Sequence, residues 1–275
     1  MSEPAPREPV GVDSTRASIA RVYDAMLNGK DNYAIDREVK QQLLEAAPQM
    51  ETIARDNREW LIRVTRFLAG TVGIEQFLDC GSGLPAAENT HEAAARLNLD
   101  TKVVYVDNDP VVSAHGRALL DEGTNGFFAT ADLTRPDEVY GNPLVARTLD
   151  LTQPTALMQV STLHHVADDH DPVAIMQSYV DNLPSGSYVA ITHFYDPEDG
   201  GPLSALASEL EEIASSGPMG SGFFRTRDQI EAMFCGLEFV NPGLQLLPDW
   251  WPDGPRTKPL FDVQRLILGG VARKP

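Results

Sequence analysis

Three aspartates follow or end short apolar runs, where their side chains could hold one ligand. Asp79 lies in the run FLDCGSGLP (77–85), Asp107 ends the run VVYVD (103–107), and Asp132 follows in TAD (130–132). Nucleotide-binding α/β folds place a carboxylate at the end of the second strand, where it accepts hydrogen bonds from ribose hydroxyls. The spacing therefore predicts a nucleoside site at the ends of successive strands.

Gly81 and Gly83 form a turn directly after the first of these runs. Two glycines let the backbone turn tightly and approach a ligand, and Pro85 suits the first turn of a following helix. Gly81-x-Gly83-x-x-Ala86 also fits a relaxed dinucleotide fingerprint. A nicotinamide-dependent (NAD) oxidoreductase is therefore an alternative at this point.

The charges around the turn favour a different cofactor. A dinucleotide would bring its anionic pyrophosphate close to Asp79. S-adenosylmethionine (SAM) instead carries an ammonium and a sulfonium group. Asp79 can accept a charge-assisted hydrogen bond from the ammonium, Asp107 can hold the ribose, and Asp132 can bind the adenine amino group. Three carboxylates suit this cationic nucleoside better than an anionic one.

These motifs resemble those of the Rossmann-type SAM-dependent methyltransferases. Asp79-x-Gly81-x-Gly83, Asp107 and Asp132 look like the first three motifs of that superfamily, although Pro85 stands where many members have a third glycine. From about residue 14 onward, the chain resembles a largely uncharacterised actinobacterial family of SAM-methyltransferase-like proteins. The segments that carry this resemblance are ARVYD (20–24), NGKDNY (28–33), AIDR (34–37), VYVDNDPVV (104–112), STLHHV (161–166) and LPSGSY (183–188).

The resemblance implies SAM as cofactor and a seven-stranded, mostly parallel sheet with a reversed last strand. It also places further residues around SAM. We expect the polar loop 28–33 to fold over the cofactor, although a solvated connection between two helices is an alternative. The additional residues expected at the cofactor are Lys30, Asp31, Tyr33, Asn108, Leu133 and Ser161.

Histidines near the ends of the fourth and fifth strands are the candidates for catalysis. Methyl transfer is an in-line displacement, so alignment supplies much of the acceleration and a general base is optional. His164, His165 and His193 lie where α/β sheets bind ligands. We take His164 and His193 as catalytic candidates, the alternative being hydrogen-bonded structural histidines.

The elements that position these residues follow from the hydrophobic pattern. Apolar runs without alternation predict parallel strands buried on both faces, and the helices between them predict an α/β Rossmann-like fold. We expect a disordered tail over 1–13, a helical cap over 14–70 that begins after Ser14 or Thr15, and a SAM-binding domain over 71–275. A helical insertion is expected near 200–222.

The expected strands are 76–79, 102–107, 127–131, 155–160 and 187–192, with helices at 88–97, 111–120, 137–149 and 172–183. The last apolar runs, 237–240 and 261–268, could pair as a terminal hairpin. Trp250 and Trp251 lie between these two runs and are expected to pack against the sheet edge or an oligomer partner.

The amino-acid composition limits the classes of molecule that the protein is expected to bind. The 275 residues carry 22 Lys and Arg against 40 Asp and Glu, a formal charge of −18. Such a surplus repels polyanions and anionic membranes, which argues against nucleic acid. Two cysteines fit a reducing cytoplasm, and neither a membrane-spanning run nor a metal motif is found. A small-molecule acceptor is therefore expected, whereas the oligomeric state is open.

The pattern thus predicts a cytoplasmic SAM-dependent methyltransferase. An alternative from another class is a SAM-binding sensor without catalysis, because no residue is clearly assigned to chemistry. An NAD-dependent oxidoreductase is the third reading.

Overall fold

The computed structural model describes residues 12–86, 88–119 and 125–275. In this part of the chain, eight strands form one sheet, in the order β3-β2-β1-β4-β5-β8-β6 with β7 paired to β8. Strands β1 to β5 pair in parallel, and β8 runs antiparallel to β5. The strands are β1 (Gln76–Cys80), β2 (Lys102–Asp107), β3 (Gly126–Thr130), β4 (Ala156–Val160), β5 (Tyr188–Phe194), β6 (Glu238–Phe239), β7 (Gln245–Leu246) and β8 (Ile267–Arg273).

The reversed strand, β8, was expected, but the sheet does not end there as the seven-stranded expectation implied. Two short strands, β6 and β7, both pair with β8 on its outer side. β6 pairs with the end of β8 and β7 with its beginning, so both lie along the same edge. The turn between them contains Pro242, which has no N–H to donate to a ladder. The predicted hairpin partner 261–268 is wrong in its bounds, since Asp262–Arg265 is a 3-10 helix and the strand begins at Ile267.

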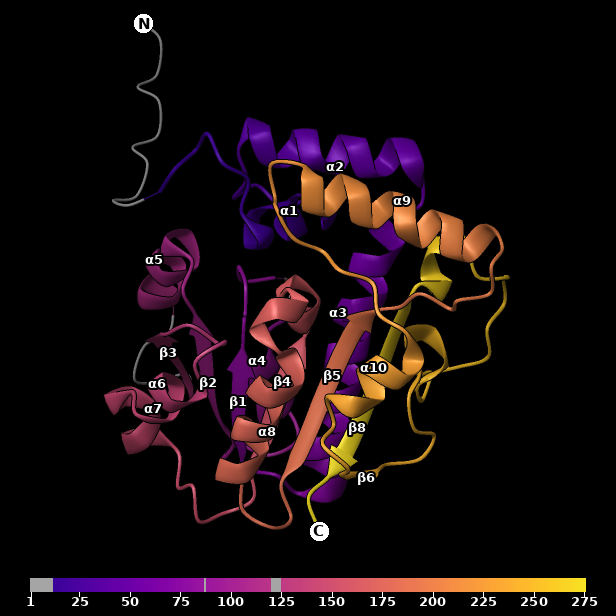
Figure 1. Ribbon diagram of the computed structural model, residues 1–275. Helices are drawn as coiled ribbons and strands as arrows, with labels where there is room; N and C mark the ends of the chain where they lie inside the picture. Colours follow the sequence, from indigo (N-terminus) through magenta and orange to yellow (C-terminus); the bar gives the residue numbers. More distant parts are fainter. Residues whose placement is uncertain (1–11, 87, 120–124) are drawn as a thin grey trace, which may run out of the picture.

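Helices cover both faces of the sheet (Figure 1). Successive strand residues face opposite sides, so Phe77 packs into the core on the α3 side and Leu78 into the core on the α8 side. The predicted helix 137–149 is split into two before Pro143. Residues 1–11 of the expected tail 1–13, and Leu120 at the end of the predicted helix 111–120, lie outside the described residues. The helices are α1 (Ile19–Met26), α2 (Ala34–Ala46), α3 (Glu51–Arg66), α4 (Thr90–Ala95), α5 (Pro110–Leu119), α6 (Pro136–Tyr140), α7 (Pro143–Thr148), α8 (Pro172–Asn182), α9 (Pro202–Ser216) and α10 (Arg227–Ala232).

A roof of α1, α2 and α9 lies over the carboxyl ends of β1 to β5, where α2 and α9 run side by side (Figure 1). The first helix begins later than expected, because Ser18 rather than Ser14 or Thr15 is its N-cap. A buried ion pair joins α1 to α2, with Arg21 Nε 2.8 Å from Asp36 Oδ2. The same carboxylate accepts hydrogen bonds from the backbone N–H groups of Ser18 and Tyr33. Asp36 therefore holds the start of both helices together.

Aromatic packing secures α3 against the last strand. The Trp250 ring is buried and meets the Trp60 ring edge to face, with centroids 5.7 Å apart. Trp250 is thus packed inside the fold against α3, whereas Trp251 is 41% exposed. Gly269 on β8 leaves room for the Trp60 ring and for Leu247, because a Cβ there would lie 2.7 Å from Trp60 Cε2 and 2.6 Å from Leu247 Cδ2.

Gly269→Ala should therefore destabilise the fold. Overpacking of this kind costs about 1–3 kcal/mol, because both neighbours belong to the buried core. Urea unfolding measures the change, and Gly254→Ala is the matched control, since a Cβ at Gly254 meets nothing within 4 Å. Equal stability of the two variants would contradict this account of the packing.

Candidate functional site

A cavity of about 780 Å³ lies between the roof and the carboxyl ends of the parallel strands. Its volume falls within the range of about 300–1,000 Å³ that is usual for small-molecule sites. Eight of the eleven residues predicted to bind the cofactor line it together, which the common edge of parallel strands explains. These residues are Asp79, Gly81, Gly83, Asp107, Asn108, Asp132, Leu133 and Ser161.

Asp79 is the most buried of the acidic residues that line the cavity, with 5% of its surface exposed. Burial raises the pKa of its carboxyl to about 6, although a hydrogen bond from Thr90 and the nearby Arg58 guanidinium both act to lower it. Thr90 Oγ1 donates to Asp79 Oδ2 at 2.7 Å. A cationic group that enters the cavity would compensate for the buried charge.

The turn after β1 brings the backbone against β2. Gly81 and Gly83 have φ of +68° and +65°, and a Cβ at Gly81 would lie 2.3 Å from Thr162 Cγ2. Pro85 does not begin a helix as expected, since residues 84–86 and 88 are irregular and Asn89 is the N-cap of α4. The first glycine therefore serves both the turn and the close contact with the segment after β4.

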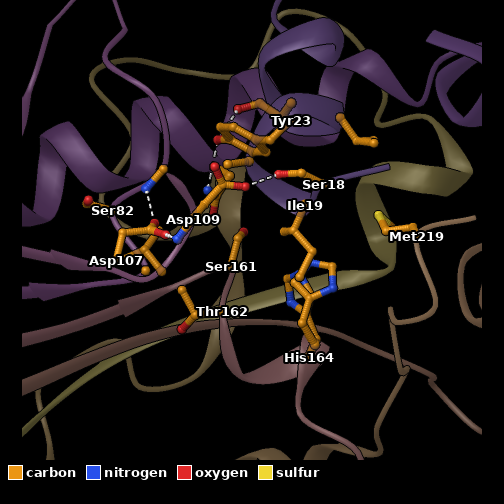
Figure 2. A pocket seen from close by; sticks show the side chains of 18 of the residues that line it. Ser18, Ile19, Tyr23, Ser82, Asp107, Asp109, Ser161, Thr162, His164 and Met219 are labelled. Atoms are coloured by element: carbon orange, nitrogen blue, oxygen red, sulfur yellow. Dashed lines mark hydrogen bonds between the residues drawn. The ribbon is translucent and has the colours of Figure 1, made fainter. Parts of the chain in front are cut away.

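Asp107 is held by two backbone N–H groups. Its Oδ2 accepts from Gly83 N and its Oδ1 from Asp109 N, both at 2.9 Å. Burial raises the pKa of Asp107. Asp109 in turn accepts from Ser18 Oγ, a contact between the roof and the end of β2 (Figure 2). The carboxylate of Asp107 is thus fixed where β2 ends.

Asp132 follows β3 and is shaped by a local turn. Its Oδ1 accepts hydrogen bonds from Thr134 N at 2.9 Å and Thr134 Oγ1 at 2.7 Å. Its Oδ2 accepts no hydrogen bond from the residues that the structure describes, so this oxygen is available to a ligand donor.

The loop 28–33 does not meet the other predicted residues. Lys30, Asp31 and Tyr33 are absent from the cavity wall. The physical reason is that Asp24 on α1 accepts hydrogen bonds from Asp31 N and Asn32 Nδ2, which draw the loop onto its own helix. Residues 16–20 line the cavity on the roof side instead.

Arg58 on α3 lines the cavity and was missed by the sequence analysis. Its Nη2 donates to the carbonyl of Glu88, while its Nε is buried without a hydrogen-bond partner among the described residues. Arg58 and Asp79 place opposite charges at one end of the cavity. Arg58 belongs to no sequence motif, so only the placement of α3 beside the cavity distinguishes it from the other arginines of that helix.

A chain of polar groups connects α1 and α3 to the sheet. Tyr23 OH accepts from Asn57 Nδ2 at 3.0 Å, and Thr192 Oγ1 donates to Asn57 Oδ1 at 2.7 Å. Ser161 N donates to Thr192 Oγ1 at 2.8 Å, which secures Ser161 at a φ of +58°. Tyr23 and Asn57 also line the cavity and were not predicted.

His164 and His165 both border the cavity. Burial lowers the pKa of His164 well below its usual range and that of His165 to about 4, so both rings are neutral near pH 7. His165 Nδ1 lies 2.9 Å from Ser221 Oγ. His164 stacks on Phe194 at 3.7 Å, and its buried Nδ1 has no partner in the described part of the chain.

His193, the second catalytic candidate, lies outside the cavity wall. Its Nε2 is 2.9 Å from Arg225 Nη1 and its Nδ1 is 2.7 Å from the carbonyl of Phe194. Because a guanidinium only donates, Nε2 accepts and Nδ1 carries the proton. Burial lowers the pKa of His193 to about 3. This ring is a neutral structural link, which is the alternative considered above.

His193→Gln should weaken the acid sensitivity of folding. Since the pKa of His193 is about 3 in the fold and near 6.5 when unfolded, the unfolded chain binds the extra proton as the pH falls between these values. Within this range His193 lowers the free energy of unfolding by about 1.4 kcal/mol for each pH unit that the pH falls. Urea unfolding at pH 4 to 6 should show a shallower slope for the variant. His170→Gln, at an exposed ring, is the control, and equal slopes in all three proteins would refute the assignment.

Two absences concern the described residues alone. In these ranges, no group of three or more His, Cys, Asp or Glu side chains is arranged to hold a metal ion. No helix there has the length and apolar character needed to span a bilayer.

Comparison with known proteins agrees with this geometry. A family model described as S-adenosyl methyltransferase matches residues 6–275. A proposed methyltransferase from Thermobifida fusca has a TM-score of 0.90 and 40% identity, covering 96% of this chain and 97% of its own. A DUF574 family protein from Streptomyces avermitilis has a TM-score of 0.87 and 35% identity, over 96% and 99%. No curated protein matches. The chain belongs to the S-adenosyl methyltransferase family.

Proposed function

We propose that this protein binds SAM along the ends of β1 to β3 and transfers its methyl group to a small-molecule acceptor. Bound SAM supplies an electrophilic methyl group on a sulfonium. The observation that carries the proposal is that Arg58 and Asp79, which influence each other electrostatically, line one cavity together with Asp107 and Asp132. Family membership supports the reaction type.

The charges fit each part of this cofactor. Asp79 would accept from the ammonium group and Arg58 would donate to the carboxylate, so the zwitterionic amino-acid end meets one charge of each sign. Asp107 would hold the ribose hydroxyls, and the free oxygen of Asp132 would accept from the adenine amino group. An anionic pyrophosphate would instead face four carboxylates, those of Asp79, Asp107, Asp109 and Asp132.

The residues of the chain contribute mainly orientation. Alignment of reacting groups can supply about 7–11 kcal/mol. The neutral His164 ring borders the same cavity and can accept a hydrogen bond from an acceptor hydroxyl, which helps to orient it. The formal charge of −18 supports a small acceptor over a polyanion, and a cytoplasmic location is part of this proposal.

Arg58→Met should weaken S-adenosylhomocysteine (SAH) binding about 10- to 100-fold, because a charge-assisted hydrogen bond contributes about 1.5–3 kcal/mol. Adenosine, which lacks the amino-acid end, should bind the variant as it binds the unmodified protein. Isothermal titration calorimetry measures both affinities. The matched control is Arg55→Met, one turn earlier on α3 and exposed. Unchanged SAH affinity in Arg58→Met would exclude the arginine from the site.

The SAH affinity should also fall in acid. Because the pKa of Asp79 is about 6 and only its ionised form attracts an ammonium, Kd should rise about tenfold per pH unit below that value. The adenosine affinity corrects for Asp107, whose pKa is raised too. Asp79→Asn should bind SAH weakly with no such slope in the SAH-to-adenosine ratio. A ratio independent of pH in the unmodified protein would contradict the role of Asp79.

A further inference from the structure

The cavity divides into a charged part and an apolar part. Its charged lining residues come from the segment before α1, from α3 and from the ends of β1 to β3. Apart from Arg58, the lining residues from α1, α3, α9, the loop after α9 and the end of β5 include no Lys, Arg, Asp or Glu in the part of the chain that the structure describes. We define the apolar chamber by Val22, Met26, Met50, Leu210, Met219 and Phe224.

A row of aromatic rings forms one side of the apolar chamber. Phe194 stacks on His164 with centroids 3.7 Å apart and on Phe224 with centroids 4.9 Å apart, each pair at 15° between planes. Three methionines, Met26, Met50 and Met219, contribute flexible thioethers to the wall. Aromatic faces and thioethers both favour contact with a flat apolar ring system.

One polar side chain in this region lacks the partner that buried groups normally have. His164 is 1% exposed, and its Nδ1 makes no hydrogen bond to any described residue. Tyr23 and Asn57, which also border the cavity, are already engaged with each other and with Thr192. Figure 2 shows the His164 ring on the opposite side of the cavity from Asp107. A hydroxyl or N–H group on an occupant would give this ring a partner.

We propose that the apolar chamber binds the methyl acceptor, and that this acceptor is an uncharged, flat and largely apolar molecule with one hydroxyl or N–H group beside His164. The inference rests on the proposed function, since it assigns the second substrate of the same cavity. A charged acceptor would lose its hydration without gaining a counter-charge in the chamber. The acids that serve SAM are on the other side, where they would repel an anionic acceptor.

Two bicyclic probes of similar shape test this. In calorimetry with saturating SAH at pH 7.5, neutral 2-naphthol should bind at least tenfold more tightly than anionic 2-naphthoate. Titrations without SAH should give the same order. Naphthoate binding that equals or exceeds naphthol binding would overturn the inference.

Met219→Lys provides the sharper test, because Met219 lies in the half-buried loop after α9 and not in the sheet core. The new cation should reduce naphthol binding about tenfold and increase naphthoate binding, while SAH affinity stays unchanged and reports the intact fold. Leu99→Lys, at a residue 79% exposed, is the matched control and should leave both probes unaffected.

The two proposals fail separately. If SAH does not bind the unmodified protein, the proposed function fails, and the probe titrations without SAH still decide the chamber. If SAH binds but Met219→Lys changes neither probe, the assignment of the apolar chamber as the acceptor site is wrong.

Discussion

The position of the roof over the site depends on the ion pair between Arg21 and Asp36, which connects α1 to α2. Both side chains are buried, and Asp36 also accepts from the backbone of Ser18 and Tyr33, so one carboxylate sets the start of α1 and of α2. Removing one member of such a pair typically costs about 3–5 kcal/mol, because the other charge stays buried without a partner. Ser18, whose N–H donates to Asp36, also donates a hydrogen bond from its hydroxyl to Asp109, and this contact connects the roof to the end of β2.

The strand order then distributes chemistry along one edge of the sheet. Asp79, Asp107 and Asp132 lie at or just after the ends of β1, β2 and β3, whereas His164 follows β4 and Phe194 ends β5. A cationic nucleoside and an apolar acceptor therefore have separate walls in a common cavity. The roof contributes mainly methionine and aliphatic side chains to the second wall, so the acceptor preference depends on the helices more than on the sheet.

The sheet and its acids could be predicted because buried parallel strands are apolar runs whose ends meet at one edge. Asp79, Asp107 and Asp132 needed only that rule. The roof could not be predicted in the same way, because its orientation depends on single contacts such as Asp24 with the loop at Asp31. The role of Arg58 could not be predicted, because it depends on where α3 lies relative to the cavity. The division of the edge into β6 and β7 could not be predicted either, because it depends on the turn that contains Pro242.

The C-terminus lies at the other end of the sheet from the cavity. Gly186 N donates to the carbonyl of Lys274, and Ser185 Oγ donates to the carbonyl of Pro275, so the last residues rest beside the beginning of β5 (Figure 1). Residues 16–20, by contrast, form part of the cavity wall. Attachment to a sensor surface through the C-terminus would therefore hold the cavity away from that surface, whereas attachment close to residue 16 would lie beside the cavity wall.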